Sequence, residues 1–411
     1  MQLCETASSM PSILTGENLF RALTVLPEYD EDIRWADASQ RLLALSDFYD
    51  IYFPSVMSME IYTKMYTSLL RSLQKKGTRL ATLQQLENHR TTIGLESRGI
   101  IGGADSFTII GPSGIGKSSA IERTISLLNG RRVIVTEHPF CKVIPVLSVQ
   151  CPFDCSVKNM LHEILRAVDE AIGTAYYPMA VHAKATTDML IGAVSQAALN
   201  HIGLLIVDEI QNVVAHRNGN MLIATLTQLI NSSGISICLV GTPECILFFE
   251  KAIHLARRTT GLRFDPLPFD DYFHSVCHLL LTYSFVRKPI ESTEALIRWL
   301  YEHTGGLVGV LISLIHDAQE IAILHQTEAL DMAALQAAYQ SRMSSIHIHT
   351  TRSQPRGTSS VGGHSRLNRT SHSSPAAECR SLAGLIQETK NCHLSIVQLL
   401  QNQDLIKEID V

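Results

Sequence analysis

FTIIGPSGIGKSSAIERTISLL, residues 107–128, joins three patterns in one stretch. An apolar run comes first, then the loop Gly111-Pro112-Ser113-Gly114-Ile115-Gly116-Lys117-Ser118, then apolar residues at helical spacing. The loop fits G-x-x-x-x-G-K-[ST] in full and has the strand before it and the helix after it that a phosphate-binding loop requires. Its glycines let backbone N–H groups turn inward around phosphate oxygens. We therefore predict a triphosphate site here, against the alternative of a chance glycine-rich turn.

The side chains that close this loop have separate expected tasks. Lys117 is expected to reach the β- and γ-phosphates, and the hydroxyl of Ser118 to ligate Mg²⁺. The helix that starts here points its N-terminal dipole at the anion. The predicted nucleotide contacts are Gly111, Pro112, Ser113, Gly114, Ile115, Gly116, Lys117, Ser118 and Ser119.

A second apolar run, GLLIVDEIQ (203–211), ends in two carboxylates. Asp208, at the end of the predicted strand, is placed to hold Mg²⁺ directly or through water. Glu209, one residue on, is placed to polarise a water for attack on the γ-phosphate. A kinase must exclude water, so this pair favours hydrolysis over phosphoryl transfer to a small molecule. The alternative for Glu209 is a solvated acid at a strand end.

Two further stretches suggest residues that respond to the γ-phosphate. ISICLVGTPE (235–244) places Thr242 at a strand end as a candidate sensor, or as a turn residue before Pro243. ARRTTGLRFDPLPF (256–269) carries Arg257 and Arg258 at a predicted helix C-terminus, where cations are favourable in any case. In an assembly, one of the two arginines is predicted to reach the neighbour's γ-phosphate as an arginine finger.

The order of apolar patterns along the chain predicts an α/β core. Strand candidates occupy 107–111, 143–149, 203–208 and 235–242, and helical runs occupy 117–128, 157–172, 186–201 and 219–232. Continuous apolar strands between helices predict a parallel sheet covered on both faces, which we bound at 96–267. Residues 268–343 have only helical spacing and predict a small helical lid, with a stop at Gly305-Gly306.

The segments outside this core have their own patterns. Residues 1–95 are predicted to be mainly helical, and the apolar stripe Ile61, Met65, Leu69, Leu73 indicates a helix packed on the core or a partner-docking arm. Residues 344–378 are rich in Ser, Thr, His, Gly and Arg and predict a disordered linker, solvated or weakly attracted to DNA. Residues 379–411 regain an apolar stripe and predict a partner-binding C-terminal helix.

The composition of the chain limits the classes of protein to which it can belong. The chain of 411 residues is 45% hydrophobic, with a net charge of −5, so it has no overall basic signal for nucleic acid. Its nine cysteines are an odd number in a chain that opens without a secretory pattern, which favours reduced thiols and a cytoplasmic location. Cys151 and Cys155 form a lone C-x3-C pair, too few ligands for zinc. No apolar run has the roughly 20 residues of a membrane helix.

These motifs together resemble an AAA+ ATPase. The resemblance covers roughly residues 90 to 340 and is carried by the loop at 111–118, LLIVDE at 204–209, LVGTPE at 239–244 and the arginine segment at 256–269. The sequence motifs DEIQN, VGTPE and LRFDPLPF resemble those of the TnsC/TniB branch, which comprises the target-selection regulators of transposons related to the bacterial Tn-seven group. The resemblance implies a P-loop AAA+ sheet sandwiched by helices, a helical lid, and ATP and Mg²⁺ as cofactors.

The same resemblance implies partners and an assembly. Such proteins form ATP-dependent homo-oligomers on double-stranded DNA, as rings or helical filaments that are heptameric or hexameric. They link a TniQ/TnsD-type target selector to a TnsB-type transposase, often with a TnsA-type nuclease, and hydrolysis disassembles the platform. DNA contacts in the family lie near the second strand and its following helix, where Lys158 is the first candidate here and Lys142, Arg166 and Lys184 are weaker ones.

The sequence departs from the family pattern at one point, and it is compatible with two other functions. The lid stretch TGGLVGVLISLI (304–315) has no Arg or Lys to read the nucleotide, so that role is in doubt for the lid. Another AAA+ role, such as replication initiation, helicase loading or secretion, is one alternative. A nucleotide-switched signalling ATPase that does not bind DNA is the other.

Overall fold

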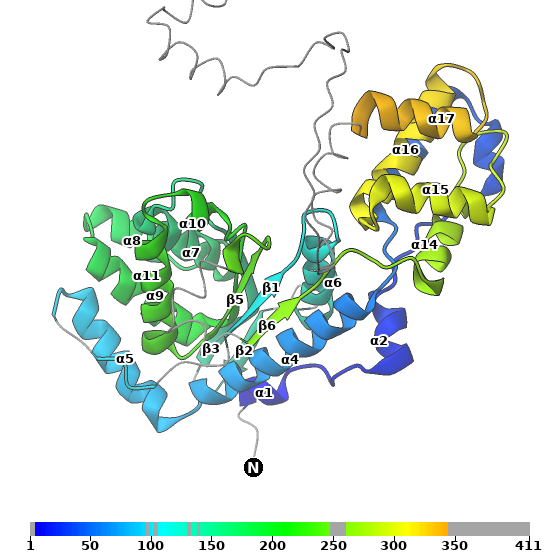
Figure 1. The fold of residues 1–411 in the computed structure, drawn as a ribbon. Helices are drawn as coiled ribbons and strands as arrows, with labels where there is room; N and C mark the ends of the chain where they lie inside the picture. The colour runs from blue at the N-terminus through cyan, green and yellow to red at the C-terminus, as the bar shows by residue number, and fades with distance from the viewer. Residues whose placement is uncertain are drawn as a thin grey trace, which may run out of the picture. The chain divides into compact units, whose positions relative to one another are not determined.

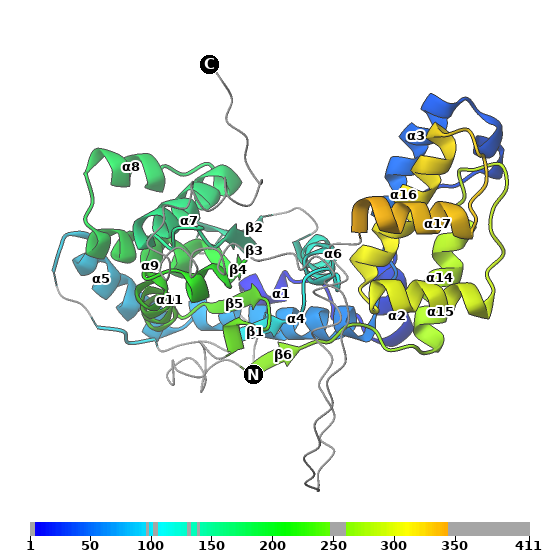
Figure 2. The same cartoon turned by 45° about the horizontal axis from the view of Figure 1, so that its top comes forward.

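Figures 1 and 2 show a computed structural model of the protein, which describes residues 5–95, 98–101, 106–129, 133–137, 140–246 and 260–343. The predicted linker at 344–378 and the predicted helix at 379–411 lie outside the described residues, and so do Arg257 and Arg258.

A six-stranded sheet forms the centre of the α/β core. Its order is β2-β3-β4-β5-β1-β6, and the pairs β3–β4, β4–β5, β5–β1 and β1–β6 are all parallel, as predicted. The strand β2 departs from that prediction, because it pairs antiparallel with β3 at the edge of the sheet. The strands are β1 (Phe107–Ile110), β2 (Ile134–Glu137), β3 (Phe140–Gln150), β4 (Ile202–Asp208), β5 (Ser236–Gly241) and β6 (Thr260–Arg263).

Successive residues of the central strands face opposite sides of the sheet, and each side has its own buried cluster. On one side Leu205 and Val207 of β4 pack with the helices α7 (Val157–Ile172), α9 (Thr187–His201) and α11 (Gly219–Ser233). On the other side Leu204 and Ile206 pack with α4 (Val56–Lys76) and α6 (Lys117–Asn129). The predicted sheet covered on both faces is therefore present.

The N-terminal helix α4 is part of the second layer. Its stripe Ile61, Met65, Leu69 and Leu73 is completely buried, which confirms packing on the core for this face of the helix. The helix begins at a capping box in which the Ser55 hydroxyl accepts from the backbone N–H of Ser58. A partner-docking role for the rest of residues 1–95 stays a prediction.

The helical lid is built from two parts of the chain. Its C-terminal part has α14 (Asp271–Thr282), α15 (Glu294–Thr304), α16 (Val308–Leu324), α17 (Met332–Ala338) and the π-helical turn η3 (Tyr339–Met343). From the N-terminal segment, Leu45 and Phe48 are buried in the same cluster. Arg41 is 2% exposed and makes two hydrogen bonds to Glu328, at 2.5 and 2.7 Å. The N-terminal segment thus contributes to the core and to the lid.

The predicted stop between two lid helices is present. Gly305 ends α15 in the left-handed conformation, with φ of 61°, and Gly306 follows with φ of 74°. A side chain at Gly306 would collide with the backbone of Leu267, since a Cβ there would lie 2.1 Å from the Leu267 carbonyl oxygen. Glycine is therefore required at this turn.

Eight further helices lie in the described residues. They are α1 (Glu5–Ser8), α2 (Gly16–Leu23), η1 (Glu31–Trp35), α3 (Ala38–Leu45), η2 (Ser46–Asp50), α5 (Arg79–Thr92), α8 (Tyr176–His182) and α10 (Asn212–Ala215). Within the described residues, no single helix is long and apolar enough to span a membrane; α15 and α16 meet that test only as a pair bent by 116°.

Candidate nucleotide-binding site

The predicted phosphate loop lies between β1 and α6. Gly114 and Gly116 have φ of 84° and 94°, values that residues with a Cβ rarely adopt. The loop is tied to the neighbouring strand, because the Gly111 N–H donates to the Gly241 carbonyl of β5 at 3.2 Å. This arrangement leaves the turn open for the approach of an anion to its backbone.

Lys117 is the first residue of α6 and is only 9% exposed. Its amino group donates to the carbonyls of Gly111 and Pro112 at 2.7 and 2.9 Å, so it is folded back over the loop. Burial lowers the pKa of Lys117, and the carboxylates of Asp208 and Glu209 oppose that shift. A buried cation above a cradle of backbone N–H groups suits a polyphosphate.

The two carboxylates at the end of β4 lie beside this loop. The Ser118 hydroxyl donates to Asp208 Oδ2 at 3.4 Å, and the Glu209 N–H donates to Asp208 Oδ1 at 2.8 Å. A hydroxyl and a carboxylate are the hard oxygen ligands that Mg²⁺ takes in nucleotide sites. The donor set therefore fits the predicted metal, with Ser118 and Asp208 as its protein ligands.

One cavity of about 330 Å³ collects the predicted chemical residues. Thr242 belongs to it and reaches it from β5, the strand next to β1. The lining is Ser113, Gly114, Gly116, Lys117, Ser118, Ser119, Asp208, Glu209, Gln211, Gly241, Thr242 and Gly309. We call it the phosphate cavity. The structure thus brings together predicted site residues, such as Ser113 and Thr242, that are separated by more than 120 positions in the sequence.

An adjoining cavity of about 220 Å³ shares Gly116, Ser119 and Gly309 with the first. Its remaining walls come from residues 49–58, from α6 and from the lid, and include the aromatic side chains of Tyr52 and Tyr272. We call it the aromatic cavity. A space with aromatic and apolar walls beside a polyphosphate site suits the nucleoside end of a nucleotide. The sequence motifs gave no sign of the contribution from residues 49–58.

The lid approaches the phosphate loop through its backbone. The Gly309 N–H, in the first turn of α16, donates to the Gly114 carbonyl at 2.8 Å. A Cβ at Gly309 would lie 3.1 Å from that carbonyl oxygen, so glycine permits this close approach. The stretch 304–315 has no Arg or Lys, and here it touches the loop without one.

The predicted DNA contacts do not form one cluster. Lys158 is exposed in the first turn of α7, whereas the Lys142 amine donates to the Ile172 carbonyl at the far end of that helix, at 3.0 Å. Arg166 pairs with Glu163 at 2.7 Å, and Lys184 lies in the turn before α9 with φ of 50°. A role for any of them in DNA binding stays a prediction.

Other side chains that can bind metals lie outside the phosphate cavity. Cys151 and Cys155 are both buried free thiols, and burial raises the pKa of Cys151 to about 12.

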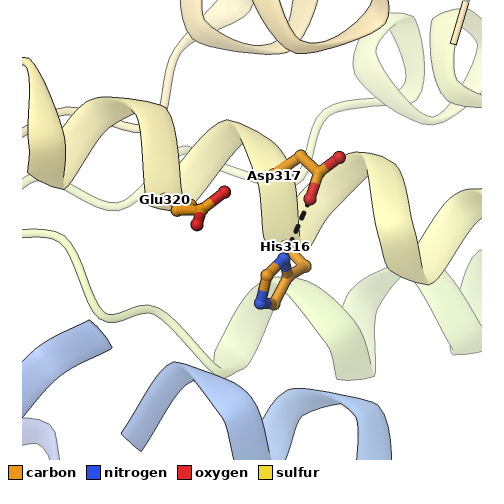
Figure 3. Close-up of side chains that lie close together, drawn as sticks. All are labelled: His316, Asp317 and Glu320. Carbon is orange, nitrogen blue, oxygen red and sulfur yellow. Dashed lines mark hydrogen bonds and ion pairs between the residues drawn. The ribbon is translucent and has the colours of Figure 1, made fainter. Parts of the chain in front are cut away.

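On α16, His316, Asp317 and Glu320 place ligand atoms within 4.8 Å of one another (Figure 3). Arg342 pairs with Asp317 at 3.0 Å and with Glu320 at 2.5 Å. These ion pairs fasten η3 to α16, so a guanidinium already pairs with both carboxylates of this cluster.

The comparisons with known proteins agree with this geometry at the level of the domain. Residues 97–247 match the family model of the AAA domain. That segment is similar to the AAA domain. It contains the phosphate loop, both β4 carboxylates and Thr242, so every side chain assigned above to the phosphate cavity, except Gly309 of the lid, lies within it.

The similarity of the chain to solved structures is weaker. The Aeropyrum pernix Orc1 protein in complex with DNA is 14% identical, covering 67% of each chain with a TM-score of 0.38. A structure of katanin, solved for its self-assembly, is 13% identical, covering 77% of this chain and 92% of that one with a TM-score of 0.37. No curated protein matches the chain.

Proposed function

We propose that this protein is an ATP-dependent regulator of DNA transposition of the TnsC/TniB kind. It hydrolyses ATP to ADP and phosphate, assembles on double-stranded DNA and links a target selector to a transposase. The observation that supports the ATPase part best is the shared phosphate cavity of Lys117, Ser118, Asp208 and Glu209 inside an AAA domain. The transposition part rests on the sequence resemblance of residues 204–269.

The side chains of the cavity divide the work of hydrolysis. The Lys117 ammonium binds the terminal phosphates and offsets their charge. Mg²⁺, held by Ser118 and Asp208, neutralises charge on the phosphate oxygens when it is bound. The Glu209 carboxylate accepts a proton from the attacking water, and Thr242 donates to the γ-phosphate from the end of β5. The aromatic cavity holds the nucleoside.

Assembly supplies the part of the mechanism that lies outside the described residues. Arg257 or Arg258 of one copy acts on the nucleotide of the next, so subunit stacking depends on the triphosphate. The DNA then contacts many copies of the same few lysines, and the favourable free energies of these contacts add along one polyanion. This explains how a chain with a net charge of −5 can bind DNA.

The test is duplex DNA binding in the presence of a non-hydrolysable ATP analogue or of ADP, measured by gel shift and fluorescence anisotropy. We expect binding at least tenfold tighter with the analogue. Lys158→Ala is expected to weaken binding and to reduce the salt dependence, whereas Lys288→Ala, an exposed lysine of the lid, serves as the matched control. Duplex binding that is indifferent to the nucleotide contradicts the mechanism, and absence of binding leaves a nucleotide-switched ATPase without DNA.

A further inference from the structure

Gln211 lies two residues after Glu209 and lines the phosphate cavity with it. Its amide nitrogen Nε2 donates a hydrogen bond to Glu209 Oε2. One of the two carboxylate oxygens of the predicted general base is therefore held by a neighbouring side chain. None of the roles assigned above uses this contact.

The backbone that carries the two side chains is fixed. Glu209 has φ of 56°, a left-handed conformation that is uncommon for a residue with a Cβ and is often found where a site dictates the backbone. The Ile210 N–H donates to the Val240 carbonyl of β5 at 2.9 Å, and the Asn212 N–H donates to the Glu209 carbonyl at 3.2 Å. With the chain held in this way, the direction of the Glu209 carboxylate depends on its side-chain torsions.

The other end of the Gln211 amide is also informative. Its oxygen Oε1 is buried and has no hydrogen-bond partner in the described part of the chain. It lies against Gly241 at the end of β5, where a Cβ would come within 3.1 Å of it. A buried acceptor without a donor is destabilising, so the amide is held in this place at a cost. Gly241 leaves room for it, directly before the candidate sensor Thr242.

We propose that Gln211 is a positioning residue for Glu209, holding one carboxylate oxygen and so orienting the other for water. The inference rests on the ATP hydrolysis of the proposed function. In that reaction the water oxygen forms a bond to the γ-phosphorus while the bond from that phosphorus to the β–γ bridging oxygen breaks. The water proton goes to Oε1 of Glu209, because Oε2 is engaged by Gln211. In this proposal Gln211 acts through Glu209 and is assigned no contact of its own with the water or the phosphate.

The test compares Gln211→Met with wild type, since methionine keeps the length of the side chain and loses both hydrogen-bonding ends. The matched control is Gln196→Met on α9, because Gln196 also has a buried amide oxygen without a partner in the described residues but lies outside both cavities. We expect Gln211→Met to lower kcat by roughly 10- to 100-fold, with KM and the dissociation constant of ATP within twofold of wild type. Retained ATP binding shows that the variant is folded.

A double-mutant cycle with Glu209→Gln separates positioning from a general structural effect. If Gln211 acts through Glu209, single-turnover hydrolysis by the double variant equals that of Glu209→Gln alone. If the double variant is slower than Glu209→Gln by the factor that Gln211→Met alone causes, the two residues act independently and the inference is wrong. It is also wrong if the kcat of Gln211→Met lies within twofold of the Gln196→Met control or above wild type. In those cases wild type still turns over and the proposed ATPase stands. A wild type without turnover, with or without DNA, contradicts the proposed function and this inference together.

Discussion

The two adjoining cavities differ in how the chain builds them. The phosphate cavity is formed almost entirely by two short motifs at the carboxyl ends of β1 and β4, with β5 beside them. The aromatic cavity needs three parts of the chain that are far apart in sequence: residues 49–58, α6 and the lid. The first contains the residues proposed for hydrolysis, and the second contains the aromatic and apolar walls proposed for the nucleoside.

Long-range contacts hold the second cavity together. The Tyr272 hydroxyl of α14 donates to the Phe53 carbonyl at 3.2 Å, across 219 positions of sequence. The Arg123 guanidinium of α6 lies 5.9 Å from the centre of the Tyr52 ring. On the proposed function, phosphate binding depends on short local motifs, whereas nucleoside binding depends on the N-terminal segment and the lid packing around the sheet.

Glu209→Gln gives the largest expected effect, and it separates the two cavities because it changes only the phosphate cavity. The variant removes the proton acceptor and keeps the shape of the side chain. We expect steady-state hydrolysis to fall by roughly 10²- to 10⁴-fold, with ATP binding and ATP-dependent assembly retained. Phosphate release measures the first, and light scattering with DNA measures the second. Loss of assembly would assign Glu209 a structural role instead.

The residues of the phosphate cavity could be predicted from the sequence for a physical reason. Glycines with positive φ, a lysine at a helix start and carboxylates at a strand end are each specified by a few adjacent residues. Strands β1, β4 and β5 were found because they are continuous apolar runs between helices.

The remaining features depend on packing between distant segments. The edge strand β2 has only four residues, of which Ile134 and Val135 are apolar, so its apolar run is shorter than those of the central strands and was not assigned to a strand. The stripe of α4 predicted a buried face but not its partner, and residues 49–58 carry no motif that marks a cavity wall. The Glu209–Gln211 contact was missed because it depends on the left-handed backbone at Glu209, which the sequence does not indicate.

Lys76 is a second lysine with a buried amino group, and it shows that burial alone does not place a lysine in the candidate site. The residue is partly exposed along its stem, but its amino group is enclosed at the C-terminal end of α9, where it donates to the Ala198 carbonyl at 2.8 Å and to that of Leu199. Burial lowers the pKa of Lys76 to about 7 from its ordinary value of 10.5. Unlike Lys117, it lines neither cavity. We therefore expect Lys76→Met to leave ATP binding unchanged.

The same variant is expected to change how stability depends on pH. Between pH values of about 7 and 10.5 the unfolded chain holds a proton at Lys76 that the folded protein has lost, so the free energy of unfolding rises with pH across this window. Wild type should gain roughly 1–3 kcal/mol over Lys76→Met between pH 7 and pH 9. Urea unfolding at both values measures this, with Lys75→Met as control. Parallel pH profiles for wild type and Lys76→Met would show that the amino group is solvated.

Calorimetric titration of wild type, Lys117→Ala and Tyr52→Ala with Mg-ATP and with inorganic tripolyphosphate tests whether one nucleotide occupies both cavities. Because the Lys117 ammonium is proposed to bind the phosphates, Lys117→Ala should lose affinity for both ligands. Tyr52→Ala should lose roughly tenfold for ATP and nothing for tripolyphosphate. Phe153→Ala, which truncates an aromatic side chain that is 87% exposed and outside both cavities, should bind both ligands like wild type. Equal affinities of wild type and Tyr52→Ala for ATP, or unchanged binding by Lys117→Ala, would contradict the account.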